Sequence, residues 1–98
     1  MRTLPKVVQV GPIVYKIEED TRTAIDGVYG AIFYADSRIS LQPGLSPAFQ
    51  EVILWHEMIH AMLTQAGLRD QDEQHIHAIA YGVVQALHNN PELVASKE

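Results

Sequence analysis

Large hydrophobic residues in the first part of the chain recur in short segments with the period of two that is typical of β-strands. Val7 to Val10 is rich in valine, and after the turn signal Gly11-Pro12 large apolar side chains occupy every second position from Ile13 to Ile17. We therefore predict two strands here. The segment from Glu19 to Gly27 is polar and is expected to be a loop.

A second strand signal follows this loop. Val28 to Tyr34 is rich in β-forming residues, and Arg38 to Leu41 alternates again. The tripeptide Ala35-Asp36-Ser37 between them has the composition of a turn, so the two segments are expected to form a hairpin. We expect a small antiparallel sheet of about three strands.

The second half of the chain has the period of an amphipathic helix. Ser46 followed by Pro47 is a helix start, with a hydroxyl N-cap and a proline at the first helical position. The helix is expected to run to Gln65 or Ala66, because Gly67 and then Leu68 fit the left-handed cap and the apolar contact that end many helices.

A second helix should follow at once. Asp70 to Glu73 reads as a D-x-x-E capping box, and the helix should continue to about His88, before Asn89-Asn90-Pro91. Its expected apolar face consists of Ile76, Ile79, Ala80, Val83, Val84 and Leu87. The short connection predicts that the two helices pack as antiparallel neighbours. The predicted class is α+β, with a single domain over residues 1–98.

Composition limits the partners and the metal ligands that this chain can have. Twelve acidic residues against seven basic ones give a net charge of −5, and the basic residues are scattered, which argues against nucleic acid as a partner. The chain has no cysteine, so a metal site must use His, Asp or Glu. Met1 to Val10 lacks the apolar stretch of a signal peptide, and no transmembrane segment is visible. We expect a cytoplasmic protein that does not bind membranes, with disorder only at Ala95 to Glu98.

The first predicted helix contains the motif H-E-x-x-H, formed by His56, Glu57 and His60. A spacing of four residues places both imidazoles on one helix face, where they can bind one zinc ion. Glu57 lies about 100° further around the helix, where it can take a proton from water activated by the metal. The alternative interpretation, without a metal site, is a pair of partly buried histidines with a surface glutamate.

A catalytic zinc ion usually has three protein ligands and one open position, so a third ligand must come from elsewhere in the chain. Glu73, His75, His77 and, less plausibly, His88 are the candidates, all on or near the second helix. We favour His77, followed by Glu73 and then His75, although Glu73 is also explained as a member of the capping box. For His75 and His88 we prefer the interpretation of an exposed histidine.

The segment His56-Glu57-Met58-Ile59-His60 resembles the active-site helix of zincin metallopeptidases. A β-rich lead-in, a Gly-Leu turn and a further helix ending in Asn-Asn-Pro-Glu-Leu make the region from Ser37 to Val94 similar to small phage- and prophage-type zincins. These resemble the minimal peptidase domain of the family that cleaves phage repressors in bacteria. The resemblance implies a minimal zincin-like fold and zinc-dependent cleavage of a peptide or protein substrate.

In the repressor-cleaving family the third ligand is a glutamate in an E-x-x-A-N segment. His77-Ala78-Ile79-Ala80-Tyr81 stands at that place, so His77 matches the glutamate and Tyr81 replaces the asparagine. The resemblance thus implies a site of three histidines, which also suits zinc. Tyr81 could place its hydroxyl near the metal as an oxyanion donor, but we prefer the interpretation of an ordinary helix tyrosine.

The resemblance also implies a mechanism, in which zinc and Glu57 activate water for attack on a peptide carbonyl. An extended substrate would pair with the edge strand of the sheet, either Arg38 to Leu41 or its hairpin partner. Two other classes of function stay open. One is a zinc-binding protein without peptidase activity, and the other is an inhibitor or antitoxin-like interaction module, for which removal of metal would leave partner binding unchanged.

Overall fold

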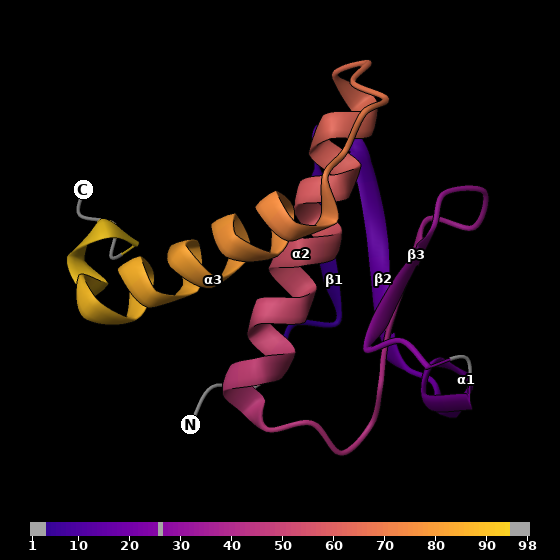
Figure 1. Ribbon diagram of the computed structural model, residues 1–98, viewed down its shortest axis with the longest axis horizontal. Helices are drawn as coiled ribbons and strands as arrows, with labels where there is room; N and C mark the ends of the chain where they lie inside the picture. The colour runs from indigo at the N-terminus through magenta and orange to yellow at the C-terminus, as the bar shows by residue number, and fades with distance from the viewer. Residues whose placement is uncertain (1–3, 26, 95–98) are drawn as a thin grey trace.

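The computed structural model describes residues 4–25 and 27–94, and these form a four-stranded sheet with two long helices stacked on one face (Figure 1). The α+β class is therefore confirmed. Residues 95–98, for which disorder was expected, lie outside the described part of the chain. The elements in chain order are β1 (Val7–Val10), β2 (Ile13–Glu19), α1 (Thr21–Ile25), β3 (Gly30–Phe33), β4 (Arg38–Leu41), α2 (Pro47–Gln65), α3 (Glu73–Asn89) and the short 3-10 helix η1 (Pro91–Leu93).

The sheet is mixed, with the strand order β1-β2-β4-β3. The pair β3–β4 is the expected antiparallel hairpin, and β1–β2 is a second one. Strands β2 and β4, however, run parallel, with Lys16 opposite Arg38 and Glu19 opposite Leu41. The expectation of a wholly antiparallel sheet of about three strands was wrong. After β2 the chain passes through α1 and then forms β3 at the outer edge of the sheet. The hairpin that follows places β4 between β3 and β2.

This order makes β3 an edge strand and β4 an interior strand. Of the two segments considered for the substrate-binding edge, Arg38–Leu41 is therefore excluded, because both of its backbone edges are already paired. Its hairpin partner, Gly30–Phe33, has one edge that no strand in the described part of the chain pairs with.

The segment expected as a loop after β2 contains one short helix, α1, of five residues. Asp20 starts this helix, since its side chain accepts a hydrogen bond from the backbone N–H of Arg22 at 2.9 Å. Thr23 also donates its hydroxyl to the backbone carbonyl of Asp20 at 2.7 Å. A single turn held by local polar contacts carries no apolar periodicity, which is why the pattern did not reveal it.

Helix α2 lies between the sheet and α3 and is buried on two sides. One core fills the space between α2 and the sheet, and consists of Val10, Tyr15, Ile39, Leu41, Ile53, Leu54 and Ala61. A second core fills the space between α2 and α3, and consists of Val52, Ile59, Ile76, Ala80 and Val84. No helix in the described ranges is long and apolar enough to cross a membrane.

Both ends of α2 are as the sequence predicts. The Ser46 side chain accepts from the backbone N–H of Phe49 at 3.3 Å. At the other end Gly67 has φ of 85°, and the N–H of Leu68 donates to the carbonyl of Leu63 at 2.9 Å. This is the Schellman motif, which favours glycine because the left-handed conformation strains other residues.

Helix α3 begins later than the capping box predicts. Its N-cap is Asp72, whose side chain accepts from the backbone N–H groups of Gln74 and His75 at 2.8 and 3.1 Å. Asp70 does not cap the helix, and Glu73 is the first helical residue instead of the third position of a capping box. Its side chain is therefore not used in a cap.

Helix α3 packs on α2 with reversed chain direction, as expected, because Glu73 contacts His56 and His60 while His88 contacts Glu51. Figure 1 shows that α3 crosses α2 obliquely and extends away from the sheet. The oblique contact buries a narrow stripe of α3, consisting of Ile76, Ala80 and Val84. Ile79 was also expected on this face, but it is 53% exposed.

Candidate metal centre

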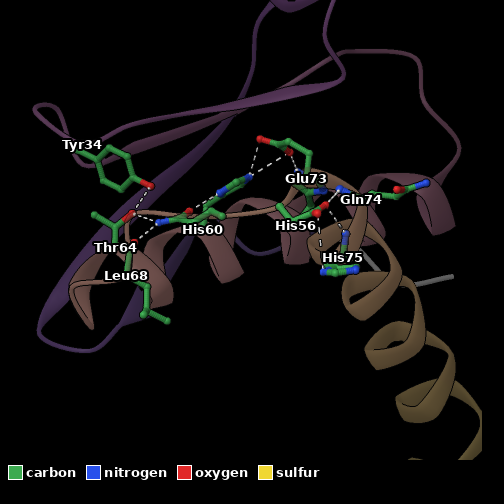
Figure 2. A network of polar contacts seen from close by, with 10 residues as sticks. Tyr34, His56, His60, Thr64, Leu68, Glu73, Gln74 and His75 are labelled. Atoms are coloured by element: carbon green, nitrogen blue, oxygen red, sulfur yellow. Dashed lines mark hydrogen bonds and ion pairs between the residues drawn. The ribbon is translucent and has the colours of Figure 1, made fainter.

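His56 and His60 lie one turn apart on α2, as the H-E-x-x-H spacing predicts, with ring centroids 5.0 Å apart. Their side chains are only 14% and 13% exposed. The helix holds both rings at its surface toward the first turn of α3, where Figure 2 shows them on either side of Glu73.

Glu73 joins the two imidazoles. One carboxylate oxygen, Oε1, lies 2.8 Å from Nε2 of His56, and the other, Oε2, lies 3.1 Å from Nε2 of His60. Among the described residues, His56, His60 and Glu73 form a group whose ligand atoms all lie within 4.8 Å of one another. The structure therefore brings the second candidate for the third ligand to the histidine pair.

The three groups influence one another's protonation in the absence of metal. Burial tends to raise the pKa of Glu73, but its hydrogen bonds with His60 and His56 outweigh this and lower the pKa. Burial tends to lower the pKa of His60, and its contacts with Gln71 and Glu73 raise it overall. The pKa of His56 is lowered, because burial outweighs the attraction of Glu73.

His77, the candidate favoured from the sequence, lies beside this group. Its ring centroid is 5.8 Å from that of His56, but it is not part of the compact set of ligand atoms found among the described residues. It lies one helical turn beyond Glu73 and lines the same cleft. His77 is therefore placed to flank the centre.

The remaining candidates lie further away. His75 is 81% exposed and faces the carboxylate of Asp72 at 3.8 Å. His88 lies 3.0 Å from Glu51, near the start of α2. Tyr81 is 56% exposed and is not among the residues that line the cleft, so the structure does not bring its hydroxyl to the centre.

Glu57 is 6% exposed, because it lies on the side of α2 that faces the sheet edge. Burial raises its pKa to about 7, although the nearby His60 partly opposes this shift. A side chain at Gly30 of β3 would collide with Ile53, and its Cβ would lie 3.4 Å from Oε2 of Glu57. The glycine thus lets the edge strand approach α2 closely where the Glu57 carboxylate lies.

A cleft of about 830 Å³ runs along this centre, between β3, α2 and the first turns of α3. His56, Glu57, His60 and Glu73 all line it. Its other wall is largely apolar and includes Tyr29 and Phe49, whose rings meet edge to face at 5.0 Å. The arrangement places two imidazoles, a bridging carboxylate and a buried carboxyl group in one cavity beside β3, an edge strand of the described sheet.

Sequence reasoning missed three residues that support His60. Oε1 of Gln71 lies 2.6 Å from Nδ1 of His60, and Nε2 of Gln71 lies 3.1 Å from the hydroxyl of Thr64. The Thr64 hydroxyl in turn lies 3.0 Å from that of Tyr34. Gln71 precedes the helix in a loop, where no periodicity marks it. The sequence did contain a signal for Glu73. If Asp72 is taken as the N-cap, Glu73 is no longer part of a capping box and its side chain is available as a ligand.

Comparisons with protein-family models, curated proteins and solved structures found no match to this chain. The candidate centre is therefore defined by its own geometry, namely the donor atoms of His56, His60 and Glu73 beside the buried carboxyl group of Glu57.

Proposed function

We propose that this chain is a zinc-dependent metallopeptidase in which His56, His60 and Glu73 hold the metal and Glu57 is the general base. The observation that carries the proposal is the convergence of two imidazoles from α2 and one carboxylate from α3 on a common point in the cleft. An ordinary surface ion pair joins one cation to one carboxylate. Here two histidines that are only 14% and 13% exposed share the carboxylate of Glu73, which is an arrangement typical of a metal site.

The donor set fits zinc. Imidazole nitrogens and a carboxylate oxygen are common zinc ligands, and three protein ligands leave the open position that catalytic sites keep. The Glu73 side chain is 72% exposed, so the side of the centre that faces the cleft is accessible. Bound zinc would supply Lewis-acid activation of water and of the substrate carbonyl.

Glu57 suits the role of general base by its position and its environment. It follows His56 directly, so its carboxyl group lies beside the metal ligands without being one of them. Burial raises its pKa to about 7 without metal, and a zinc ion bound beside it would lower this pKa and favour the carboxylate, the form that accepts a proton. In this role the carboxylate takes a proton from the attacking water and later passes it to the amine that leaves.

The edge strand β3 gives the substrate a place to bind. The backbone N–H and C=O groups on its outer edge, which no described strand pairs with, can pair with an extended peptide, which would then run along the cleft past the centre. The apolar wall around Tyr29 and Phe49 suits hydrophobic side chains of such a peptide. The proposed substrate class is therefore an extended or unfolded polypeptide.

The first test is metal content, measured by elemental analysis after zinc loading and desalting. Equimolar zinc is expected in the wild type and in Glu57→Gln, and zinc should be lost in His56→Ala, His60→Ala and Glu73→Ala. His77→Ala is the matched control, because it removes a neighbouring imidazole that lies outside the compact ligand group. Loss of zinc in His77→Ala with retention in Glu73→Ala would assign the third ligand to His77.

The second test is zinc-dependent cleavage of an unfolded protein or a mixed peptide library. Glu57→Gln should bind zinc normally and lose activity by about 10²-fold or more, the scale of general acid–base catalysis. Equimolar zinc without any cleavage would favour the alternative function, a metal-binding protein without peptidase activity. No zinc in the wild type would exclude both.

A further inference from the structure

The loop between α2 and α3 places a glutamine against the far side of one metal-binding imidazole. Oε1 of Gln71 lies 2.6 Å from Nδ1 of His60, the ring nitrogen that points away from His56 and Glu73. We propose that Gln71 is a positioning residue of the metal centre, which holds His60 in the tautomer and orientation that present Nε2 to the metal. This inference rests on the proposed zinc site.

The neighbours of Gln71 fix the direction of its amide. Its Nε2 lies 2.7 Å from the backbone carbonyl of Leu68 and 3.1 Å from the hydroxyl of Thr64. A carbonyl oxygen can only accept, so the NH₂ end of the amide must face Leu68 and the oxygen end must face His60. An amide oxygen also only accepts, so Nδ1 of His60 must carry the proton in this contact. In a neutral imidazole Nε2 then carries the lone pair that binds metal.

The Thr64 hydroxyl extends this contact to the sheet. It lies 3.0 Å from the hydroxyl of Tyr34, the residue that follows β3, and Figure 2 shows the dashed contacts from Tyr34 to Thr64. The amide of Gln71 is therefore held by both α2 and the loop, while Thr64 is held from the strand side. An amide fixed at two points is a rigid acceptor for His60.

The two imidazoles of the centre differ in whether their Nδ1 atom has a hydrogen-bond partner. Nδ1 of His56 is buried and has no hydrogen-bond partner among the described residues. Gln71 thus orients one of the two ring ligands and leaves the other to helix geometry and packing. Since hydrogen-bond partners of ligand histidines commonly change metal affinity by about 10- to 100-fold, the contribution of Gln71 is large enough to measure.

The test compares the zinc affinities of full-length variants by competition with a chelating indicator. Gln71→Met keeps the length of the side chain and removes the acceptor, so its affinity should fall about 10- to 100-fold. Gln71→Glu keeps an oxygen acceptor for Nδ1–H but loses the donor to the Leu68 carbonyl, so its affinity should fall less than that of Gln71→Met. Gln85→Met, the same exchange at an exposed position of α3, is the control and should be unchanged.

A spectroscopic signature separates positioning from a merely structural role. In zinc-loaded protein labelled with ¹⁵N-histidine, the Nδ1–H of His60 should exchange slowly with solvent, because it donates to Gln71. This signal should broaden or vanish in Gln71→Met and persist in Gln85→Met. Its absence from the folded, zinc-loaded wild type would overturn the inference without any variant.

The possible outcomes distinguish the two proposals. A wild type that takes up no zinc would overturn the metal centre and the role of Gln71 together. A wild type that binds zinc, with equal affinity in Gln71→Met, would overturn only the role of Gln71. An equal loss in Gln71→Met and Gln71→Glu, both folded by circular dichroism, would show that the residue shapes the loop and does not orient His60.

Discussion

The carboxylate of Glu73 accepts a hydrogen bond from Nε2 of His56 at 2.8 Å, across the interface between α3 and α2. The two residues are 17 positions apart, so this contact exists only when α3 is docked on α2. Zinc bound by the same groups would connect the same two helices. Metal binding and fold stability are therefore expected to be coupled.

Zinc should raise the melting temperature of the wild type relative to chelator-treated protein. A ligand that binds only the folded state at 100 times its dissociation constant stabilises it by about 2.7 kcal/mol. For a chain of this length each kcal/mol corresponds to about 4–8 °C. A shift of more than 10 °C is thus expected by scanning fluorimetry.

Glu73→Gln should reduce this zinc-dependent shift strongly, since an uncharged amide is a poor zinc ligand. His77→Ala is the control and should keep the shift. Equal melting temperatures with and without zinc in the wild type would contradict the coupling between metal and fold.

Glu57→Gln should change how the stability of the metal-free protein depends on pH. Burial raises the pKa of Glu57 from 4.5 to about 7, so the folded state holds this proton more tightly than the unfolded state. The resulting stabilisation is complete below pH 4.5 and is lost as pH rises to about 7. On the order of 3 kcal/mol is at stake.

The measurement is urea unfolding in chelator at pH 4.5 and at pH 8, for the wild type and Glu57→Gln. The glutamine variant should gain stability relative to the wild type as pH rises, because it cannot ionise. Titrating groups that do not interact with Glu57 are common to both proteins and cancel in the difference, whereas His60, whose pKa depends partly on the Glu57 charge, does not cancel fully. A difference that stays constant between the two pH values would show that Glu57 is not shifted by burial.

Gly30→Ala should destabilise the protein by about 1–3 kcal/mol, the usual range for overpacking. The added Cβ would lie 2.5 Å from Cγ2 of Ile53, a buried β-branched side chain on α2 that cannot rotate away easily. The strand would have to move off α2, and this would also disturb Glu57.

Gly82→Ala is the matched control for this substitution. Gly82 lies inside α3, and a Cβ there would meet nothing within 4 Å. The same exchange should therefore stabilise the protein by up to about 1 kcal/mol, since alanine favours the helix. Chemical unfolding of both variants should give changes of opposite sign. Changes of the same sign would contradict the close approach at Gly30.

Asp72→Ala should weaken zinc binding without removing a ligand. The Asp72 side chain caps α3 through the N–H groups of Gln74 and His75, and Glu73 is the first residue of that helix. Fraying of this turn would release Glu73 and lower zinc affinity several-fold. Ser46→Ala, which removes the cap of α2, should cost about 1 kcal/mol of stability and leave zinc affinity unchanged. Zinc affinity measured by chelator competition distinguishes the two cases. A loss in Asp72→Ala alone shows a local effect on Glu73, and an equal loss in both variants shows a general effect of lower stability.

Much of the local structure follows from the sequence alone. The bounds of α2 were set by Ser46-Pro47 and Gly67, and the position of β4 by the alternation from Arg38 to Leu41. These features depend on neighbours a few residues apart, where capping and side-chain periodicity act directly. The placement of His56 and His60 on one face of a helix belongs to the same class of information.

The direction of strand pairing is different, because it depends on residues far apart in the chain. The β3–β4 hairpin was foreseen from its turn, but the parallel pairing of β2 with β4 was not. Alternation records which face of a strand is buried and says nothing about which strand lies beside it. The short helix α1 escaped notice because a single capped turn has no period.

Tertiary structure alone decided the composition of the centre. The oblique docking of α3 on α2 places Glu73 between the two imidazoles and leaves His77 one turn further along the cleft. A helical wheel gives the angle of a residue around its own axis, but not the angle at which two helices cross. The sequence determined the two histidines and Glu57 through the period of a single helix, whereas Glu73 and Gln71 meet them only because separate segments pack together.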